Sequence, residues 1–178
     1  EVLFNNALVH GDTPRFMVEQ GGGGWEAVSW RTFAAQTAGC ASWLDGLGIG
    51  RGDFAAIFAD NSVAWLAAAL GIQTSGAAMV PIYGNSSADQ VRYVVEHAEV
   101  KAIFVDAGAK AALLQDALAA AGSTGGATTR PEVVLIEGPA ESVSAPHDPT
   151  CTWSQIIAAG ASAYVRDPGV VTEMLNAL

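Results

Sequence analysis

Residues Gly46–Phe58 read "GLGIGRGDFAAIF" and place four glycines at every second position ahead of an apolar run. The run from Phe54 to Ala59 shows no polar alternation, which predicts a strand in a sheet that is covered on both faces. Ahead of the glycines, apolar residues recur every three or four positions over residues 30–47, which predicts an amphipathic helix. We therefore interpret the glycines as the end of a helix and a tight turn that leads into a central strand.

The same glycines resemble a phosphate-binding loop, but their position argues against that role. A dinucleotide fingerprint needs G-x-G-x-x-G after a strand and at the start of a helix. Here a helix precedes and a strand follows, and the third glycine of the pattern would fall at Arg51 or Asp53. The second glycine-rich stretch, Gly122–Pro131, has the same inverted order and no lysine, so it is predicted to be a surface loop.

The rest of the chain alternates buried strands with helices. We expect strands over residues 54–59, 77–83, 102–105 and 133–136, and helices over residues 30–47, 63–74, 88–97, 107–121, 153–159 and in the tail after residue 169. Ser87-Ala88-Asp89-Gln90 has the pattern of a capping box. Two apolar-aromatic runs around Gly21–Gly24 predict a hairpin. The predicted fold class is α/β: a doubly wound, mostly parallel sheet flanked by helices, with an antiparallel N-terminal β ribbon.

Composition excludes several classes of protein. The 178 residues carry 8 basic and 18 acidic side chains, a net charge of -10, which disfavours a nucleic-acid partner. The longest apolar run, Val63–Ile72, is about half of the roughly 20 residues that a membrane span needs. The two cysteines, Cys40 and Cys151, form no metal-binding or disulfide pattern, which favours a cytoplasmic setting. The chain begins at Glu1 and ends in an apolar stretch, so both ends are interpreted as cut from a longer protein.

No set of residues in this sequence forms a complete catalytic pattern. The three histidines have unlike contexts: His10 lies in a polar N-terminal segment, His97 in the last turn of a predicted helix, and His147 in a Pro-rich loop. Asp60 and Asp106 follow predicted strands, as the acids of a metal-binding receiver site would. The paired early acids and the late-strand lysine of such a site are missing, and Asp60 is more simply a helix cap. We therefore predict no catalytic residue and no metal ligand.

The order of several short motifs resembles the N-terminal part of AMP-forming acyl-CoA synthetases, within the adenylate-forming ligase superfamily. Residues 25–33, "WEAVSWRTF", are similar to the first core motif of that family, and "LGIGRGD" is similar to its "LG(V/I)xxGDxV" turn. Asn61 with Trp65 is similar to "N(R/S)xEW". Residues 70–83 resemble "LGxxxxGAxxVPxY", and residues 87–93 resemble the "SxxQVxY" of the long-chain fatty acid branch. "PEVVLIEG" and "TWSQIIAAG" are similar to the next strand and helix, so the resemblance covers nearly the whole chain.

The resemblance implies a two-step ligase. ATP and a carboxylic acid form an acyl-adenylate and pyrophosphate with Mg²⁺ neutralising the phosphates, and the thiol of coenzyme A then displaces AMP. The "(S/T)SGTTGxPKG" phosphate loop of the family, its "YGxTE" segment and its C-terminal lysine do not occur in this sequence. Residues 1–178 are therefore expected to be the inert N-terminal subdomain of a synthetase, with the rest of the parent ligase chain as partner and a fatty acid as substrate of the parent. The parent is expected in the cytoplasm, where it could also associate peripherally with membranes.

The resemblance also implies one binding site, where the pantetheine arm of coenzyme A enters such ligases. The matching residues are Tyr83, Gly84 and Asn85, although the sequence reads "YGNS" where the fatty acid branch has "YPTS". The alternative at this position is a plain strand-to-helix turn capped by Ser87. The alternative for the whole chain is a non-catalytic binding or assembly module, a homodimer scaffold with at most weak coenzyme A affinity. A free-standing Rossmann-like nucleotide protein is a third and weaker hypothesis, because the order of glycines and helix is inverted.

Overall fold

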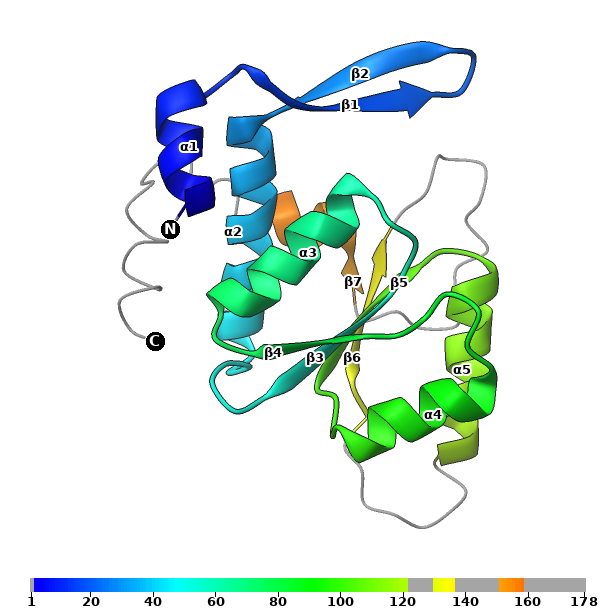
Figure 1. Ribbon diagram of the computed structural model, residues 1–178. Coiled ribbons are helices and arrows are strands. Elements are labelled where there is room, and N and C mark those ends of the chain that lie inside the picture. The colour runs from blue at the N-terminus through cyan, green and yellow to red at the C-terminus, as the bar shows by residue number, and fades with distance from the viewer. Residues whose placement is uncertain (1, 122–129, 137–150, 159–178) are drawn as a thin grey trace.

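The computed structural model describes residues 2–121, 130–136 and 151–158. These residues form a five-stranded parallel sheet with helices on both faces and a separate two-stranded antiparallel ribbon (Figure 1). The predicted fold class is thereby confirmed. Along the chain the elements are α1 (Val2–His10), β1 (Pro14–Gln20), β2 (Gly24–Ser29), α2 (Trp30–Gly46), β3 (Phe54–Phe58), α3 (Val63–Thr74), β4 (Ala78–Pro81), α4 (Ala88–His97), β5 (Ala102–Asp106), α5 (Ala109–Ala121), β6 (Glu132–Ile136) and β7 (Cys151–Thr152), followed by helical residues 153–158.

The alternating glycines form the turn that their order predicts. Gly48 has a φ of 70°, a left-handed conformation that favours glycine, and the next N–H, of Ile49, donates to the carbonyl of Leu44 at 2.9 Å. Gly52 has a φ of 90°, and the N–H of Asp53 donates to the carbonyl of Gly50 at 3.0 Å. The stretch therefore ends α2, reverses direction and starts β3.

Each face of the parallel sheet is covered by its own set of helices, as the apolar strands predict. On β3, Ala55 and Ile57 lie in the core that α2, α3 and residues 153–158 share, whereas Ala56 and Phe58 lie in the core that α4 and α5 share. Figure 1 shows α2 and α3 on one side of the strands and α4 and α5 on the other. Strands buried on both faces cannot alternate apolar and polar residues, which accounts for the sequence of the FAAIF run.

The first helix, α1, was not predicted; the context of His10 was interpreted only as a polar N-terminal segment. Its buried side chains, Phe4 and Ala7, pack against three alanines of α2: Ala34, Ala35 and Ala38. The helix is thus stabilised by contact with a partner more than twenty residues away rather than by its own sequence.

The ribbon extends away from the body of the fold (Figure 1). Its strands pair in antiparallel register, with Met17 opposite Ala27. Near its base, Phe16 meets Phe33 of α2 edge-on, with 4.9 Å between ring centroids. Further out, Trp25 is 63% exposed.

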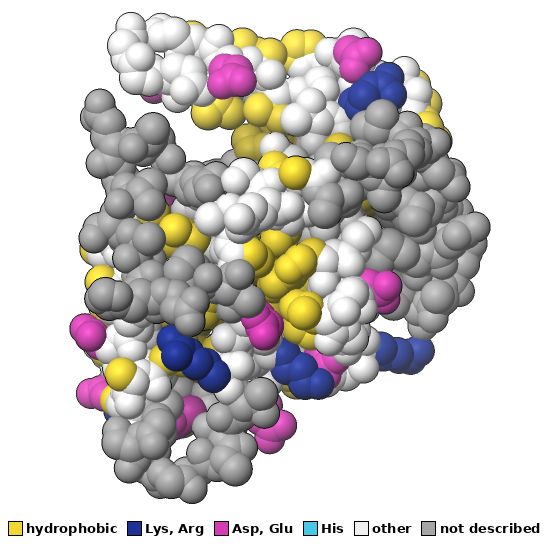
Figure 2. All heavy atoms as spheres, turned by 180° about the vertical axis from the view of Figure 1, so that it is seen from behind, with side chains coloured by type: hydrophobic (Ala, Val, Ile, Leu, Met, Phe, Trp, Pro, Cys, Tyr) yellow, Lys and Arg dark blue, Asp and Glu magenta, His cyan; other side chains and the backbone are white. Residues whose placement is uncertain are grey.

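Several other expectations differ from the structure or lie beyond what it describes. β7 was not predicted as a strand; it pairs with β6 and completes one edge of the sheet. Most of the Gly122–Pro131 loop, His147 and the tail after residue 169 lie outside the described residues. None of the described helices is both long and apolar enough to cross a membrane. On the face seen in Figure 2, Lys and Arg side chains lie among acidic ones rather than gathering into a basic patch.

Candidate functional site

The order of the strands points to one place for a ligand site. The sheet order is β4-β3-β5-β6-β7, so the chain leaves β3 toward β4 and then returns past β3 to β5. In doubly wound sheets, ligands bind outside the carboxyl ends of the strands where the order reverses in this way. The two strands at the reversal are β3 and β5. Asp60 follows the end of β3, and Asp106 is the last residue of β5.

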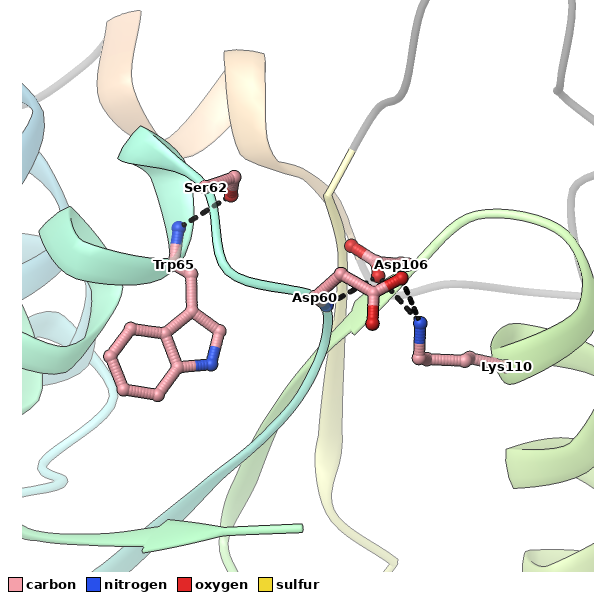
Figure 3. Close-up of polar contacts among 5 residues, drawn as sticks. All are labelled: Asp60, Ser62, Trp65, Asp106 and Lys110. Carbon is pink, nitrogen blue, oxygen red and sulfur yellow. Dashed lines mark hydrogen bonds and ion pairs between the residues drawn. The ribbon is translucent and has the colours of Figure 1, made fainter. Parts of the chain in front are cut away.

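A lysine from a third element joins these two aspartates. Lys110, in the first turn of α5, places Nζ 2.7 Å from Oδ2 of Asp60 and 3.1 Å from Oδ2 of Asp106. In Figure 3 the lysine side chain reaches from α5 toward both carboxylates. The side chain of Lys110 is only 16% exposed, whereas that of Asp60 is 81% exposed. The cation therefore sits under the surface, with one carboxylate beside it and the other facing solvent.

A backbone hydrogen bond ties the same group together. The N–H of Asp60 donates to Oδ2 of Asp106 at 2.7 Å, so this one oxygen accepts from both the backbone after β3 and Lys110. Hydrogen bonds to an ionised carboxylate are stronger than neutral ones. The end of β3, the end of β5 and the start of α5 are thus held by one ion-pair triad, defined here as Asp60, Asp106 and Lys110.

The charge of the triad limits what can bind there. Burial lowers the pKa of Lys110, but hydrogen bonds from its ammonium to Asp60 and Asp106, together with the charges of both carboxylates, outweigh burial and raise it above the usual value of 10.5. Lys110 is therefore protonated at neutral pH, and the two carboxylates leave the triad with an excess of negative charge. Phosphate groups are repelled by such a site, whereas neutral amide and hydroxyl groups are not.

One of the predicted coenzyme A residues, Gly84, lies directly against this triad. A β-carbon built on Gly84 would be 3.3 Å from Oδ1 of Asp60 and 3.5 Å from Cε of Lys110. On either side of it, Tyr83 is 83% exposed and Asn85 is exposed as well. The structure therefore brings the Tyr83–Asn85 loop together with the strand-end acids, which the sequence treated as unrelated.

One expectation about the strand-end residues was wrong. Asp60 does not cap α3; the cap is Ser62, whose Oγ accepts the N–H of Trp65 at 3.0 Å (Figure 3). The lysine that pairs with the strand-end acids was not predicted; it lies on α5 and not at the end of a strand. The signal that could have found Lys110 is its closeness to Asp106 along the chain, four residues across the short turn that joins β5 to α5.

The remaining candidates are not brought together. His10 ends α1 and lies near Trp30, with 5.8 Å between ring centroids, while His97 ends α4 and stacks on Tyr93 at 5.2 Å. The capping box is confirmed: Oγ of Ser87 accepts the N–H of Gln90, and the amide oxygen of Gln90 accepts the N–H of Ser87. The alternative interpretation of this loop, a strand-to-helix turn capped by Ser87, is therefore consistent with the structure.

Within the described parts of the chain, no three His, Cys, Asp or Glu side chains gather in a way that could hold a metal ion. Both carboxylates of the triad are already paired with Lys110. These residues therefore do not fit a magnesium site, and no step through Mg²⁺ is assigned to them.

Comparison with known proteins identifies the family. A model of the AMP-binding enzyme family matches residues 3–161, which is most of the chain. The chain belongs to the AMP-binding enzyme family. The resemblance to AMP-forming acyl-CoA synthetases, seen in the order of the sequence motifs, is confirmed.

Relatives of this AMP-binding enzyme chain are longer or cover only part of it. It is 30% identical over 169 residues to the long-chain-fatty-acid–CoA ligase FadD15 of Mycobacterium bovis, covering 94% of this chain and 25% of that ligase. It is 32% identical over 84 residues to an uncharacterized protein of Mycobacterium tuberculosis, covering 47% of this chain and 48% of that protein. The chain thus spans about half of one relative and a quarter of the other.

Solved structures share the fold of this AMP-binding enzyme chain. The anthranilate CoA ligase AuaEII, solved with anthranoyl-AMP, superposes with a TM-score of 0.66 at 18% identity, covering 89% of this chain and 27% of that one. A benzoate CoA ligase from Burkholderia xenovorans gives 0.63 at 17% identity, covering 89% and 28%. At these identities the likeness concerns the fold alone.

Proposed function

We propose that residues 1–178 are the N-terminal subdomain of a ligase that activates a long-chain fatty acid with ATP and joins it to coenzyme A. The observation that carries the proposal is the 30% identity to a long-chain-fatty-acid–CoA ligase over 94% of this chain, within a family match over residues 3–161. In the first step a carboxylate oxygen of the fatty acid attacks the α-phosphorus of ATP, and pyrophosphate leaves. In the second step the thiol sulfur of coenzyme A attacks the acyl carbonyl, its proton passes to water, and AMP leaves.

The described residues support a role in the second step rather than the first. The Tyr83–Asn85 loop is open to solvent and borders a triad with excess negative charge. The pantetheine arm of coenzyme A is a neutral chain of amides, so it can pass such a surface, whereas the phosphates of ATP and coenzyme A are better placed away from it. Tyr83, Gly84 and Asn85 are accordingly proposed to line the place where the pantetheine arm enters. ATP, Mg²⁺ and the acyl chain are bound by the remainder of the ligase, and the parent is cytoplasmic.

Pyrophosphate exchange tests this proposal. With ATP and a panel of fatty acids, residues 1–178 alone should give no exchange, while the longer ligase that contains them should give exchange with long-chain acids. Coenzyme A should then be acylated by the longer protein only. Exchange by residues 1–178 alone would contradict the proposed division of labour, and a longer protein without exchange would contradict the proposed reaction.

A second candidate is a non-catalytic binding or assembly module that forms a homodimer. One observation favours it: the Mycobacterium tuberculosis relative is itself short, because the 84 matched residues make up 48% of it. Titration calorimetry with coenzyme A and light scattering on residues 1–178 separate the two candidates. Binding heat or a dimer mass supports the module, and a flat titration with a monomer mass rejects it.

A further inference from the structure

The Tyr83–Asn85 loop is fixed at both ends by hydrogen bonds. Before it, the N–H of Ile82 donates to the carbonyl of Ile57 at 2.9 Å, which ties the end of β4 to β3. After it, the capping box of Ser87 and Gln90 starts α4. Within it, the N–H of Ser86 donates to the carbonyl of Tyr83 at 3.0 Å and closes a turn. These hydrogen bonds involve residues on either side of Gly84 and Asn85, which form the middle of the turn.

In the middle of the turn, Gly84 lies next to two residues of the ion-pair triad, Asp60 and Lys110. The space beside the α-carbon of Gly84 is filled by Oδ1 of Asp60 and Cε of Lys110, which would lie 3.3 Å and 3.5 Å from an added β-carbon. A β-carbon at position 84 would thus lie tightly against the Asp60 carboxylate and in ordinary van der Waals contact with the Lys110 side chain. The carboxylate of Asp60 is otherwise exposed, so the ion pair with Lys110 is what holds it in this position.

Lys110 itself cannot easily move. Its side chain is 16% exposed and is held by two carboxylates, one of which also accepts a backbone N–H from the residue after the neighbouring strand. A lysine that reaches solvent through a flexible stem would not constrain its neighbours in this way. Gly84 in the loop therefore lies beside a held cation that belongs to a different element, α5.

We propose that Lys110 is a positioning residue for transfer to coenzyme A: through the triad it sets the path of the Tyr83–Asn85 loop past which the pantetheine arm travels. This inference rests on the proposed function. The thiol must approach the acyl carbonyl along a narrow direction while the carbon–oxygen bond to AMP breaks, and a displacement of about 1 Å lowers such rates on the order of 100-fold. The first half-reaction does not use the loop and is independent of Lys110.

The test measures the two half-reactions separately in the longer ligase that contains these residues. Lys110→Met should leave pyrophosphate exchange within about twofold of wild type, while it raises the KM for coenzyme A or slows single-turnover thioester formation by on the order of 10- to 100-fold. Lys110→Arg keeps the charge and should recover part of the loss. The control is Lys101→Met, which removes another strand-end ion pair, with Asp53, at the opposite end of β5. It should leave the ratio of the two half-reactions unchanged.

A second variant provides an independent test in case Lys110→Met does not fold. Gly84→Ala keeps the triad but places a methyl group against it, and it should reduce thioester formation selectively. The inference is overturned if both half-reactions fall in parallel with the melting temperature, or if Lys110→Met leaves the coenzyme A step unchanged. A wild-type ligase without pyrophosphate exchange overturns the proposed function itself, which is a distinguishable failure.

Discussion

Gly71 on α3 lies directly against Cys40 on α2: a β-carbon built on Gly71 would be 2.6 Å from Cβ and 2.7 Å from Sγ of Cys40. It would also lie 3.0 Å from the carbonyl oxygen of Thr37, which is backbone and cannot rotate away. Cys40 and Gly71 are both buried, and the Cys40 thiol faces the carbonyl of Ala68 at 3.9 Å. The two helices thus approach each other as closely as they do because position 71 has no side chain.

Gly71→Ala is expected to destabilise the chain by about 1–3 kcal/mol, since a methyl group overpacks a core that has no room for it. Urea unfolding measures the change. Gly46→Ala is the matched control, because nothing lies within 4 Å of a β-carbon there and alanine is the better helix former. Equal unfolding midpoints for Gly71→Ala and wild type would contradict the close helix contact.

Asp53 is expected to stabilise the fold in a pH-dependent way. Its carboxylate pairs with Lys101 and accepts the N–H of Gly50, and these two contacts, in that order, hold its pKa below the usual 3.8. The stabilisation is present above pH 3.8 and is lost as the pH falls through the lowered pKa of the folded state. Asp53→Asn should therefore lower the free energy of unfolding at pH 7. The difference in this free energy between the variant and wild type should become smaller as the pH falls below 3.8. Urea unfolding between pH 7 and pH 3 measures this difference. Asp116→Asn, on the exposed side of α5, is the control for removing an acidic side chain elsewhere on the surface.

The two cysteines are expected to differ in reactivity toward iodoacetamide. Burial raises the pKa of the fully buried Cys40 thiol, so it should be alkylated only when the chain unfolds. Burial, and then the charge of Glu132, raise the pKa of the half-buried Cys151 to about 11. About one thiol in a thousand is then ionised at pH 8. Native labelling followed by mass spectrometry should find Cys151 slowly modified, with a rate that increases from pH 8 to pH 10. Rapid labelling of Cys40 in folded protein would contradict its burial.

Ser87→Ala is expected to cost about 1 kcal/mol, because it removes one of the two reciprocal bonds that start α4. Thermal unfolding measures the loss. Ser86→Ala, one residue earlier and outside the capping box, is the control. If both substitutions shift the melting temperature equally, the effect does not come from the cap.

Local patterns were sufficient for most of the parallel sheet and its helices. Helix 63–74, the capping box at Ser87 and the turn at Gly48 follow from features within a few residues of each other, and the structure places them where they were predicted. β3, β5 and β6 also match within a few residues, because burial on both faces leaves continuous apolar runs. β4 matches as well, although it lies at the edge of the sheet and none of its residues is fully buried. The two-residue β7 has no such run to reveal it.

What could not be predicted depends on contacts between segments that are distant in sequence. α1 is helical because Phe4 and Ala7 meet α2, and neither residue is distinctive on its own. Gly71 matched a family motif, but its physical reason is the proximity of Cys40. Part of the candidate site could be predicted, because Asp60 and Asp106 were recognised as strand-end acids. Their ion pairs with Lys110 and the closeness of Gly84 form only when four segments of the chain come together.

The position of β3 inside the sheet has a consequence for the chain as it leaves the ribosome. One edge of β3 pairs with β4, which ends at Pro81. The other edge pairs with β5, which is synthesised later because it begins only at Ala102. At the usual rate of translation this interval is on the order of seconds. During that time an apolar strand has one edge unpaired, and such an edge can pair with other chains. A strand that is enclosed on all sides in the finished protein is therefore open to wrong pairing while the protein is being made.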